Sequence, residues 1–217
     1  VQSWKAGRRG APHRRREAMP EAKGLTLVTN KMCPFAQRAW FGLEESGLGY
    51  TLRECQLYPK PKWLLEMNPK GKVPVLVDDA TGVPTDESEV ILDAIAERAR
   101  PALDGAPEEA ERAARWRRVV NEQLLPAGQE AKYGGRGGDA SLRRAYQQLE
   151  ELIVGPFVTG DSLCVADVSA APMLQRLFED NMVPTEFAKL HAWWAAVSER
   201  PAFQKTKLSP GSYWWWW

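Results

Sequence analysis

The sequence predicts an α/β amino-terminal domain followed by an all-α carboxy-terminal domain. Short β-branched runs alternate with segments of helical periodicity over the first 100 residues, whereas only helical periodicity follows. Between the two parts, residues 101–107 (PALDGAP) have the Pro and Gly content of a linker. A chain of 217 residues is long enough to bury a sizeable core in this arrangement.

The first part is expected to contain four strands and three helices. Residues 25–29 (LTLVT) and 50–57 predict strands, and residues 35–46 between them predict a helix, so the two strands are parallel with a right-handed crossover. A short helix at 63–67, strands at 73–78 (VPVLVD) and 83–85, and a helix at 89–98 follow. This βαβ-α-ββα order is that of a thioredoxin-like domain.

The second part is expected to be a helical bundle. Helical periodicity covers residues 108–125, 139–154, 165–181 and 185–199, and a Gly-rich loop lies at 134–138. The predicted domains are therefore residues 19–100 and 101–217. Residues 1–18 are rich in Arg and Gly and are interpreted as a leader segment outside the fold, a vector remnant or a transit-peptide remnant.

Composition disfavours several classes of function. The formal net charge of +1 gives no reason to expect a nucleic-acid partner. No apolar run approaches the roughly 20 residues that span a bilayer, so no membrane segment is expected. The three cysteines are dispersed without a CxxC pair, which disfavours a zinc site or a disulfide framework and fits a reducing compartment.

Cys33 is the main candidate for chemistry. It lies where the first strand meets a helix that Pro34 begins, and the free N–H groups of a helix start favour a thiolate there. We therefore expect the pKa of Cys33 to be lowered. Ala36 stands where a dithiol enzyme has its second cysteine, so a covalent intermediate must be released by an external thiol, which points to glutathione.

Two further motifs predict a binding site for a peptide-like thiol. Pro74, at the start of the third strand, is expected to follow a cis peptide bond that leaves the backbone of Val73 free to pair with a ligand; an ordinary strand-edge proline is the alternative. Glu87 and Ser88 begin a helix, whose free N–H groups can receive a carboxylate. The alternative for this second motif is plain helix capping.

The other two cysteines are interpreted as structural. Cys55 lies in the second predicted strand and is expected to fill the core. Cys164 comes three residues before Asp167, where a Ser or Thr cap is usual. With no histidine close to Cys33 in the sequence, a Cys-His protease has little support.

Several motifs, taken in order, make the chain resemble a cysteine-type glutathione transferase. They are CPFAQR (33–38), KPKW (60–63), NPKGKVPVL (68–76) and Glu87-Ser88. The second half, with GPFVTGD (155–161), ADVSAAP (166–172) and FQKTK (203–207), resembles the plant-type dehydroascorbate reductases. The resemblance covers roughly residues 25–213 and implies the glutathione transferase fold.

The resemblance also implies roles for individual residues. Cys33 would be the nucleophile, and dehydroascorbate would enter beside it, close to Arg176. The implied glutathione site consists of Phe35, Lys60, Val73, Pro74, Glu87 and Ser88. Glutathione would be a co-substrate, with no metal or other cofactor. A monomer in the cytoplasm is expected, or in the chloroplast.

Departures from the family pattern leave other functions open. Met32 stands where plant reductases usually carry Asp before the nucleophile, and Cys164 replaces a capping Ser or Thr. One alternative is a lambda- or omega-class thioltransferase, and another is a non-catalytic binding module of the same fold. The four tryptophans at 214–217 are either a disordered tail or a segment that folds back beside Arg176 to border the substrate cleft.

Overall fold

The computed structural model describes residues 24–99, 103, 109–133 and 138–207. Its first part is a four-stranded sheet in the order β2-β1-β3-β4. The strands are β1 (Leu25–Thr29), β2 (Tyr50–Glu54), β3 (Val75–Asp78) and β4 (Pro84–Asp86). β1 is parallel to β2 and antiparallel to β3, which pairs antiparallel with β4. The predicted thioredoxin-like arrangement is confirmed.

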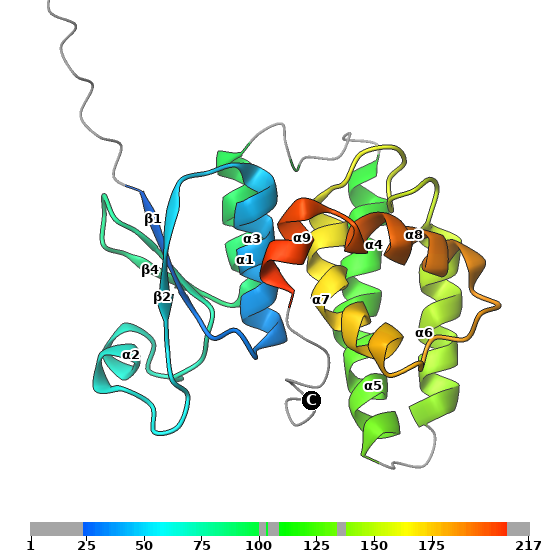
Figure 1. The fold of residues 1–217 in the computed structure, drawn as a ribbon, viewed down its shortest axis with the longest axis horizontal. Coiled ribbons are helices and arrows are strands. Elements are labelled where there is room, and N and C mark those ends of the chain that lie inside the picture. Colours follow the sequence, from blue (N-terminus) through cyan, green and yellow to red (C-terminus); the bar gives the residue numbers. More distant parts are fainter. Residues whose placement is uncertain (1–23, 100–102, 104–108, 134–137, 208–217) are drawn as a thin grey trace, which may run out of the picture.

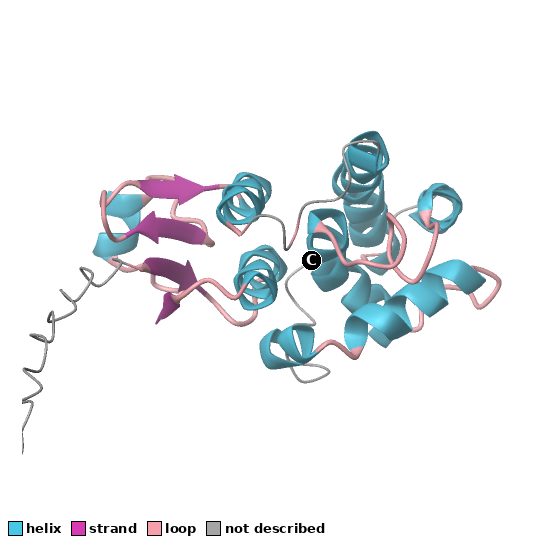
Figure 2. Cartoon of the chain, turned by 90° about the horizontal axis from the view of Figure 1, so that it is seen from above, coloured by secondary structure: helices cyan, strands magenta, loops and turns pink. Residues whose placement is uncertain are grey.

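Helices cover both faces of this sheet. α1 (Pro34–Ser46) and α3 (Ser88–Arg98) lie between the sheet and the rest of the molecule, and α2 (Lys62–Met67) lies on the opposite side (Figures 1 and 2). Successive side chains of β1 point to opposite faces of the sheet, so this strand packs against the helices on both sides. Leu25 and Leu27 join the large core that includes α1 and α3, whereas Val28 joins a small cluster with Leu64 of α2.

The second part is entirely helical apart from connecting segments, within the described residues. Its elements are α4 (Ala110–Val119), η2 (Val120–Leu124), α5 (Leu125–Lys132), α6 (Gly138–Leu152), α7 (Val165–Glu179), α8 (Ala188–Ser198) and α9 (Pro201–Thr206). α7 lies at the centre, and its residues 166–177 are all buried. α1 packs against α7 and α9, so the two parts share one hydrophobic core (Figure 1).

The largest departures from the predicted helices are two shifted boundaries and one additional helix. The helix expected at 108–125 continues to Lys132 and contains the π-helical segment η2, because Pro126 has no N–H to donate to the preceding turn. The helix expected to begin at residue 185 begins at Ala188, after a turn in which the Phe187 N–H donates to the Pro184 carbonyl (3.2 Å). The short helix α9 was not predicted.

Some predictions concern residues that the structure does not describe. The leader at 1–18, the linker at 101–107 apart from Leu103, and the tryptophans at 214–217 lie outside the described residues. Among the residues that are described, no helix has the length and apolar character needed to cross a membrane.

Candidate active site

Cys33 stands at the junction of β1 and α1, as expected. It has an extended backbone (φ −87°, ψ 118°) and is the N-cap of the helix that Pro34 begins. Its N–H donates to the Asn30 carbonyl (2.9 Å), and its carbonyl accepts from the Gln37 N–H (2.9 Å). The thiol donates to the carbonyl of Val73 at 3.7 Å. The side chain is therefore held between the helix start and the loop before β3.

The electrostatic surroundings of the thiol contain opposing effects. Burial raises the pKa of Cys33, and it outweighs the stabilisation of the thiolate by the N–H groups of Ala36 and Phe35 and by the positive charges of Arg176 and Arg38. The expected lowering of the pKa is therefore wrong in this geometry. The helix start acts in the predicted direction, but the sequence did not reveal how deeply the thiol is buried.

Cys33 opens onto a cavity of about 310 Å³. All six residues predicted for the glutathione site line this cavity together with the nucleophile: Phe35, Lys60, Val73, Pro74, Glu87 and Ser88. Further lining residues were not singled out by the sequence: Pro34, Leu57, Tyr58, Asn68, Gly71, Lys72 and Asp86. Three of these, Asn68, Gly71 and Lys72, belong to the motif at 68–76, which indicated this part of the site without showing which of its residues line the cavity.

The loop before β3 forms one wall of the cavity. The peptide bond between Val73 and Pro74 is cis, as predicted. The paired residues of β3 begin at Val75, so Val73 lies outside the sheet register with β1 and β4. Its backbone is placed at the cavity beside the thiol, where a peptide-like ligand can pair with it.

Gly71 determines how Lys60 reaches the cavity. Gly71 has a positive φ of 59°, a conformation that other residues adopt at a cost. A Cβ at this position would lie 2.8 Å from Lys60 Cδ and 2.9 Å from Leu65 Cδ2. The Lys60 side chain therefore runs across the bare backbone of Gly71.

The start of α3 forms another wall of the cavity. Glu87 is its N-cap and has a strained backbone (φ 67°, ψ 116°), which is typical of a functional position. Lys70 bridges the carboxylates of Asp86 (3.0 Å) and Glu87 (2.9 Å). Ser88 is buried, and its hydroxyl accepts a hydrogen bond from Arg38. Among the residues that the structure describes, no side chain caps this helix start, so the capping alternative is wrong.

Arg176 is close to the nucleophile but does not line the cavity. It lies in α7, is only 1% exposed, and donates to the Pro172 carbonyl and to Gln37 Oε1. Burial lowers its pKa to about 10, while the Cys33 thiolate acts in the opposite direction. Its contact with an incoming substrate remains a prediction.

The other cysteines are structural, as predicted. Cys55 is 1% exposed in the cluster beneath α2. Cys164 is the N-cap of α7, and its N–H donates to Asp167 Oδ2 (2.8 Å). The other oxygen of Asp167 accepts from the Val158 N–H (3.0 Å) and from Trp193 Nε1 (2.7 Å).

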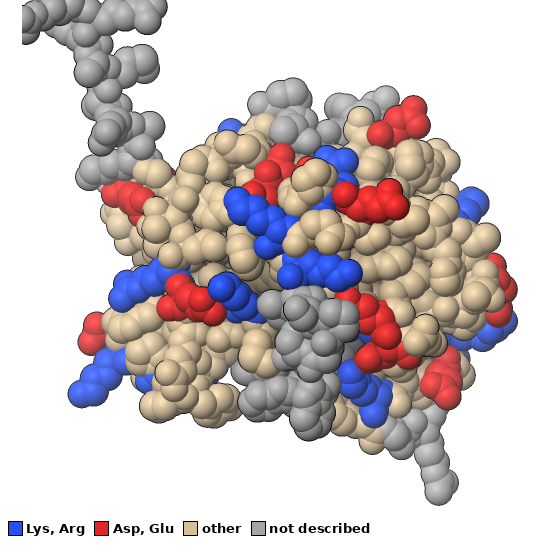
Figure 3. All heavy atoms as spheres, in the orientation of Figure 1, with Lys and Arg blue, Asp and Glu red and all other residues tan. Residues whose placement is uncertain are grey.

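Among the described residues, no group of three or more His, Cys, Asp and Glu side chains is placed to hold a metal ion. Basic and acidic side chains are intermixed over the face shown in Figure 3. The cavity lining carries both signs: Lys60 and Lys72 are basic, and Asp86 and Glu87 are acidic. Such a site suits a ligand that has a carboxylate and an ammonium group.

The geometry thus defines a thioredoxin-like domain with one cysteine at a helix start, joined to a helical domain. Comparison with family models agrees: residues 32–98 match the glutathione S-transferase N-terminal domain, and residues 138–201 match its C-terminal domain. The fold resembles that of glutathione transferase Omega 3C from Trametes versicolor (TM-score 0.78, 23% identity, covering 90% of this chain and 93% of that one).

Curated relatives narrow this assignment. The probable glutathione S-transferase DHAR1, cytosolic, of Oryza sativa subsp. japonica is 32% identical over 82% of this chain and 84% of that relative. Glutathione S-transferase DHAR3, chloroplastic, of Arabidopsis thaliana is 29% identical over 85% and 73%. Glutathione S-transferase omega-1 of Sus scrofa is 28% identical over 88% and 84%. The chain belongs to the glutathione S-transferase family, and it resembles the DHAR-type members. These relatives support a glutathione-dependent thiol oxidoreductase activity.

Proposed function

We propose that the protein reduces dehydroascorbate to ascorbate with two molecules of glutathione. The observation that carries this proposal is a single thiol, Cys33, facing a cavity lined by groups suited to both ends of a tripeptide. Ala36 leaves the motif without a second thiol, so the enzyme needs an external one to complete a turnover. The similarity to DHAR-type relatives supports dehydroascorbate as the oxidant.

In the proposed cycle the Cys33 thiolate attacks a carbonyl carbon of dehydroascorbate and forms a C–S bond. The thiolate of a first glutathione then attacks the sulfur of Cys33. The C–S bond breaks, its electron pair remains on the substrate, which takes up protons to become ascorbate, and a mixed disulfide forms on Cys33. A second glutathione thiolate attacks this disulfide, releases glutathione disulfide and restores the Cys33 thiolate.

The walls of the cavity have separate roles in this proposal. Lys60 pairs with the glycine carboxylate of glutathione, and the backbone of Val73 pairs with its cysteinyl residue. Glu87 and Ser88 hold the γ-glutamyl end at the start of α3. Phe35 and Pro74 supply the apolar surface beside the thiol.

The decisive experiment measures glutathione-dependent formation of ascorbate by its ultraviolet absorbance. Cys33→Ser is expected to lose more than about nine-tenths of the turnover, because a hydroxyl is not ionised near neutral pH. Cys55→Ser is the matched control, since Cys55 is a buried cysteine outside the cavity lining. A Cys33→Ser variant that keeps its activity would contradict the mechanism and favour a non-catalytic binding module.

The similarity to omega-class relatives supports one alternative, a thioltransferase that acts on mixed disulfides. Comparing kcat/KM for dehydroascorbate with that for a glutathionylated thiol separates the two functions. A higher value for the disulfide would replace the proposed substrate and keep the role of Cys33.

A further inference from the structure

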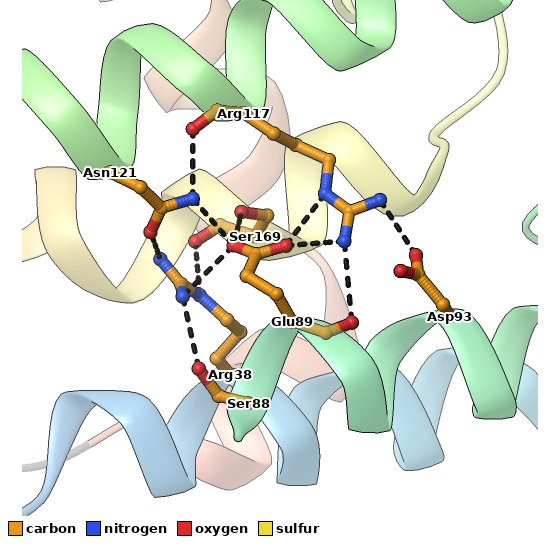
Figure 4. A network of polar contacts seen from close by, with 7 residues as sticks. All are labelled: Arg38, Ser88, Glu89, Asp93, Arg117, Asn121 and Ser169. Carbon is orange, nitrogen blue, oxygen red and sulfur yellow. Dashed lines mark hydrogen bonds and ion pairs between the residues drawn. The ribbon is translucent and has the colours of Figure 1, made fainter.

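A partly buried cluster of polar side chains lies where α1, α3, α4, η2 and α7 meet (Figure 4). Arg38, on α1, is at its centre and is only 1% exposed. We call this cluster the Arg38 network; its members are Arg38, Ser88, Glu89, Asp93, Arg117, Asn121 and Ser169. One member, Ser88, also lines the cavity that contains Cys33. The network therefore connects the candidate glutathione site with the helical part of the molecule.

Each nitrogen of the Arg38 guanidinium has its own acceptor. Nε donates to the Ser169 carbonyl (2.7 Å), and Nη2 donates to Asn121 Oδ1 (3.1 Å). Nη1 donates to Ser88 Oγ (3.0 Å) and lies 2.9 Å from Glu89 Oε1. Because the guanidinium is planar and is held on three sides, the nitrogen beside Ser88 has a fixed position.

This contact determines what the Ser88 hydroxyl can do. A hydroxyl has one proton to donate and two lone pairs that accept. The guanidinium of Arg38 contains only donor groups and no accepting atom. Ser88 must therefore accept the hydrogen bond from Arg38, and the proton of its own hydroxyl points elsewhere. Among the described residues Arg38 is the hydrogen-bond partner of this side chain. Since Ser88 lines the cavity, its proton is available to an acceptor there, and a carboxylate is the strongest such acceptor.

Glu89 balances the buried positive charge of Arg38 and leaves the preference of the Ser88 hydroxyl for a carboxylate unchanged. Its carboxylate is shared by Arg38, by Arg117 (Nε to Oε2, 2.6 Å), by Asn121 Nδ2 (2.8 Å) and by the Ser169 hydroxyl (2.5 Å). These partners lower the pKa of Glu89 against the effect of burial. The negative charge of Glu89 is thus shared among these four partners within the network.

From this arrangement we infer that Arg38 is a positioning residue for glutathione recognition. It orients the Ser88 hydroxyl as a donor and so selects the α-carboxylate of the γ-glutamyl group. The inference rests on the proposed function, because it names the group that Ser88 binds in that site. It also makes glutathione affinity depend on the helical part, whose Ser169 and Asn121 hold the guanidinium.

The test is a set of glutathione dissociation constants measured by calorimetric titration of the full chain. Arg38→Lys keeps a positive charge beside Glu89 but loses the fork, so glutathione is expected to bind about tenfold more weakly, as with Ser88→Ala. Arg117→Lys is the matched control, because Arg117 also pairs with Glu89 but does not contact Ser88. Its dissociation constant is expected to stay within about twofold of the wild type.

Two further measurements distinguish positioning from general stability. In the double variant Arg38→Lys/Ser88→Ala, binding is expected to match that of Ser88→Ala alone, because both changes remove the same contact. With 4-aminobutyryl-cysteinylglycine, which lacks the α-carboxylate, all variants are expected to bind like the wild type. If Arg38→Lys fails to fold, Asn121→Ala replaces it in the test. Asn121→Ala is expected to weaken glutathione binding about threefold, and to have no further effect when Ser88→Ala is already present.

The inference would be overturned if Arg38→Lys and Arg117→Lys weakened glutathione binding equally. It would also be overturned if the loss of affinity in the double variant equalled the product of the two single losses. A loss that persists with the analogue would do the same. The proposed function has a separate readout: a wild-type chain that does not bind glutathione would refute that function itself. A wild-type chain that binds glutathione with independent variant effects would refute only the role of Arg38.

Discussion

Replacing Gly71 with alanine would test how the cavity wall is built. Gly71 and Gly82 both have positive φ, 59° and 70°. The methyl group of Gly71→Ala would lie 2.8 Å from Lys60 Cδ and 2.9 Å from Leu65 Cδ2, whereas a Cβ at Gly82 would meet no atom of the described residues within 4 Å, apart from its chain neighbours. Gly82→Ala is therefore a control for the backbone cost alone.

The expected magnitudes follow from these distances. The left-handed backbone costs each alanine variant about 1–2 kcal/mol. Gly71→Ala must also displace two side chains, which adds about 1 kcal/mol, the lower end of the range for overpacking. In a chain of this size, each kcal/mol lowers the melting temperature by about 2–4 °C. If the displaced Lys60 no longer reaches the glycine carboxylate, KM for glutathione rises by about tenfold.

Thermal melting of both variants and steady-state kinetics at varied glutathione concentration measure these effects. Gly71→Ala is expected to melt below Gly82→Ala, and only Gly71→Ala should have a raised KM for glutathione, with kcat nearly unchanged. Equal melting temperatures would refute the packing of Lys60 over Gly71. A normal KM in a destabilised Gly71→Ala would refute the role of Lys60 in binding.

Three other outcomes are expected. Because burial raises the pKa of Cys33, kcat/KM should rise about tenfold per pH unit from neutral pH towards that pKa; a flat profile would contradict the burial argument. Cys55→Ser and Cys164→Ser should keep full turnover in ascorbate assays, and an inactive but folded variant would show that one thiol is not enough. Asp167→Ala should lower the free energy of unfolding in urea by about 3 kcal/mol or more, since Trp193 Nε1 and two backbone N–H groups lose their acceptor; unchanged stability would exclude this.

The fold was largely predictable because helices and strands differ in the period of their hydrophobic residues and because several of them begin or end at Pro or Gly. Pro34 and Gly47 delimit α1, and the alternating residues of β1 identify a strand with two covered faces. The boundaries that failed depend on tertiary context. The segment around Pro126 remains helical because a π-helical turn absorbs the missing donor, and α9 has only six residues, too few for a periodic pattern.

The candidate site was predictable where function depends on local geometry. The cysteine at the start of α1, the cis peptide before Pro74 and the start of α3 are each visible in a few neighbouring residues. Burial is different, because it depends on what packs against a residue from elsewhere in the chain. Sequence motifs alone therefore do not show that the pKa of Cys33 is raised. Nor do they show that Arg38 is buried against Ser169, which is 131 positions away.

The shared core of the two parts has a consequence for dissecting the molecule. One hydrophobic cluster contains Leu27 and Ile95 from the α/β part and Trp116, Leu174 and Phe203 from the helical part. Phe41 of α1 meets Phe203 of α9 edge to face, with ring centroids 5.2 Å apart. Cutting the chain near residue 100 would leave the outer faces of α1 and α3 as an adhesive apolar surface. The two halves should therefore melt in one calorimetric transition, and the thiol-bearing half will not serve as a free-standing module for fusion or screening.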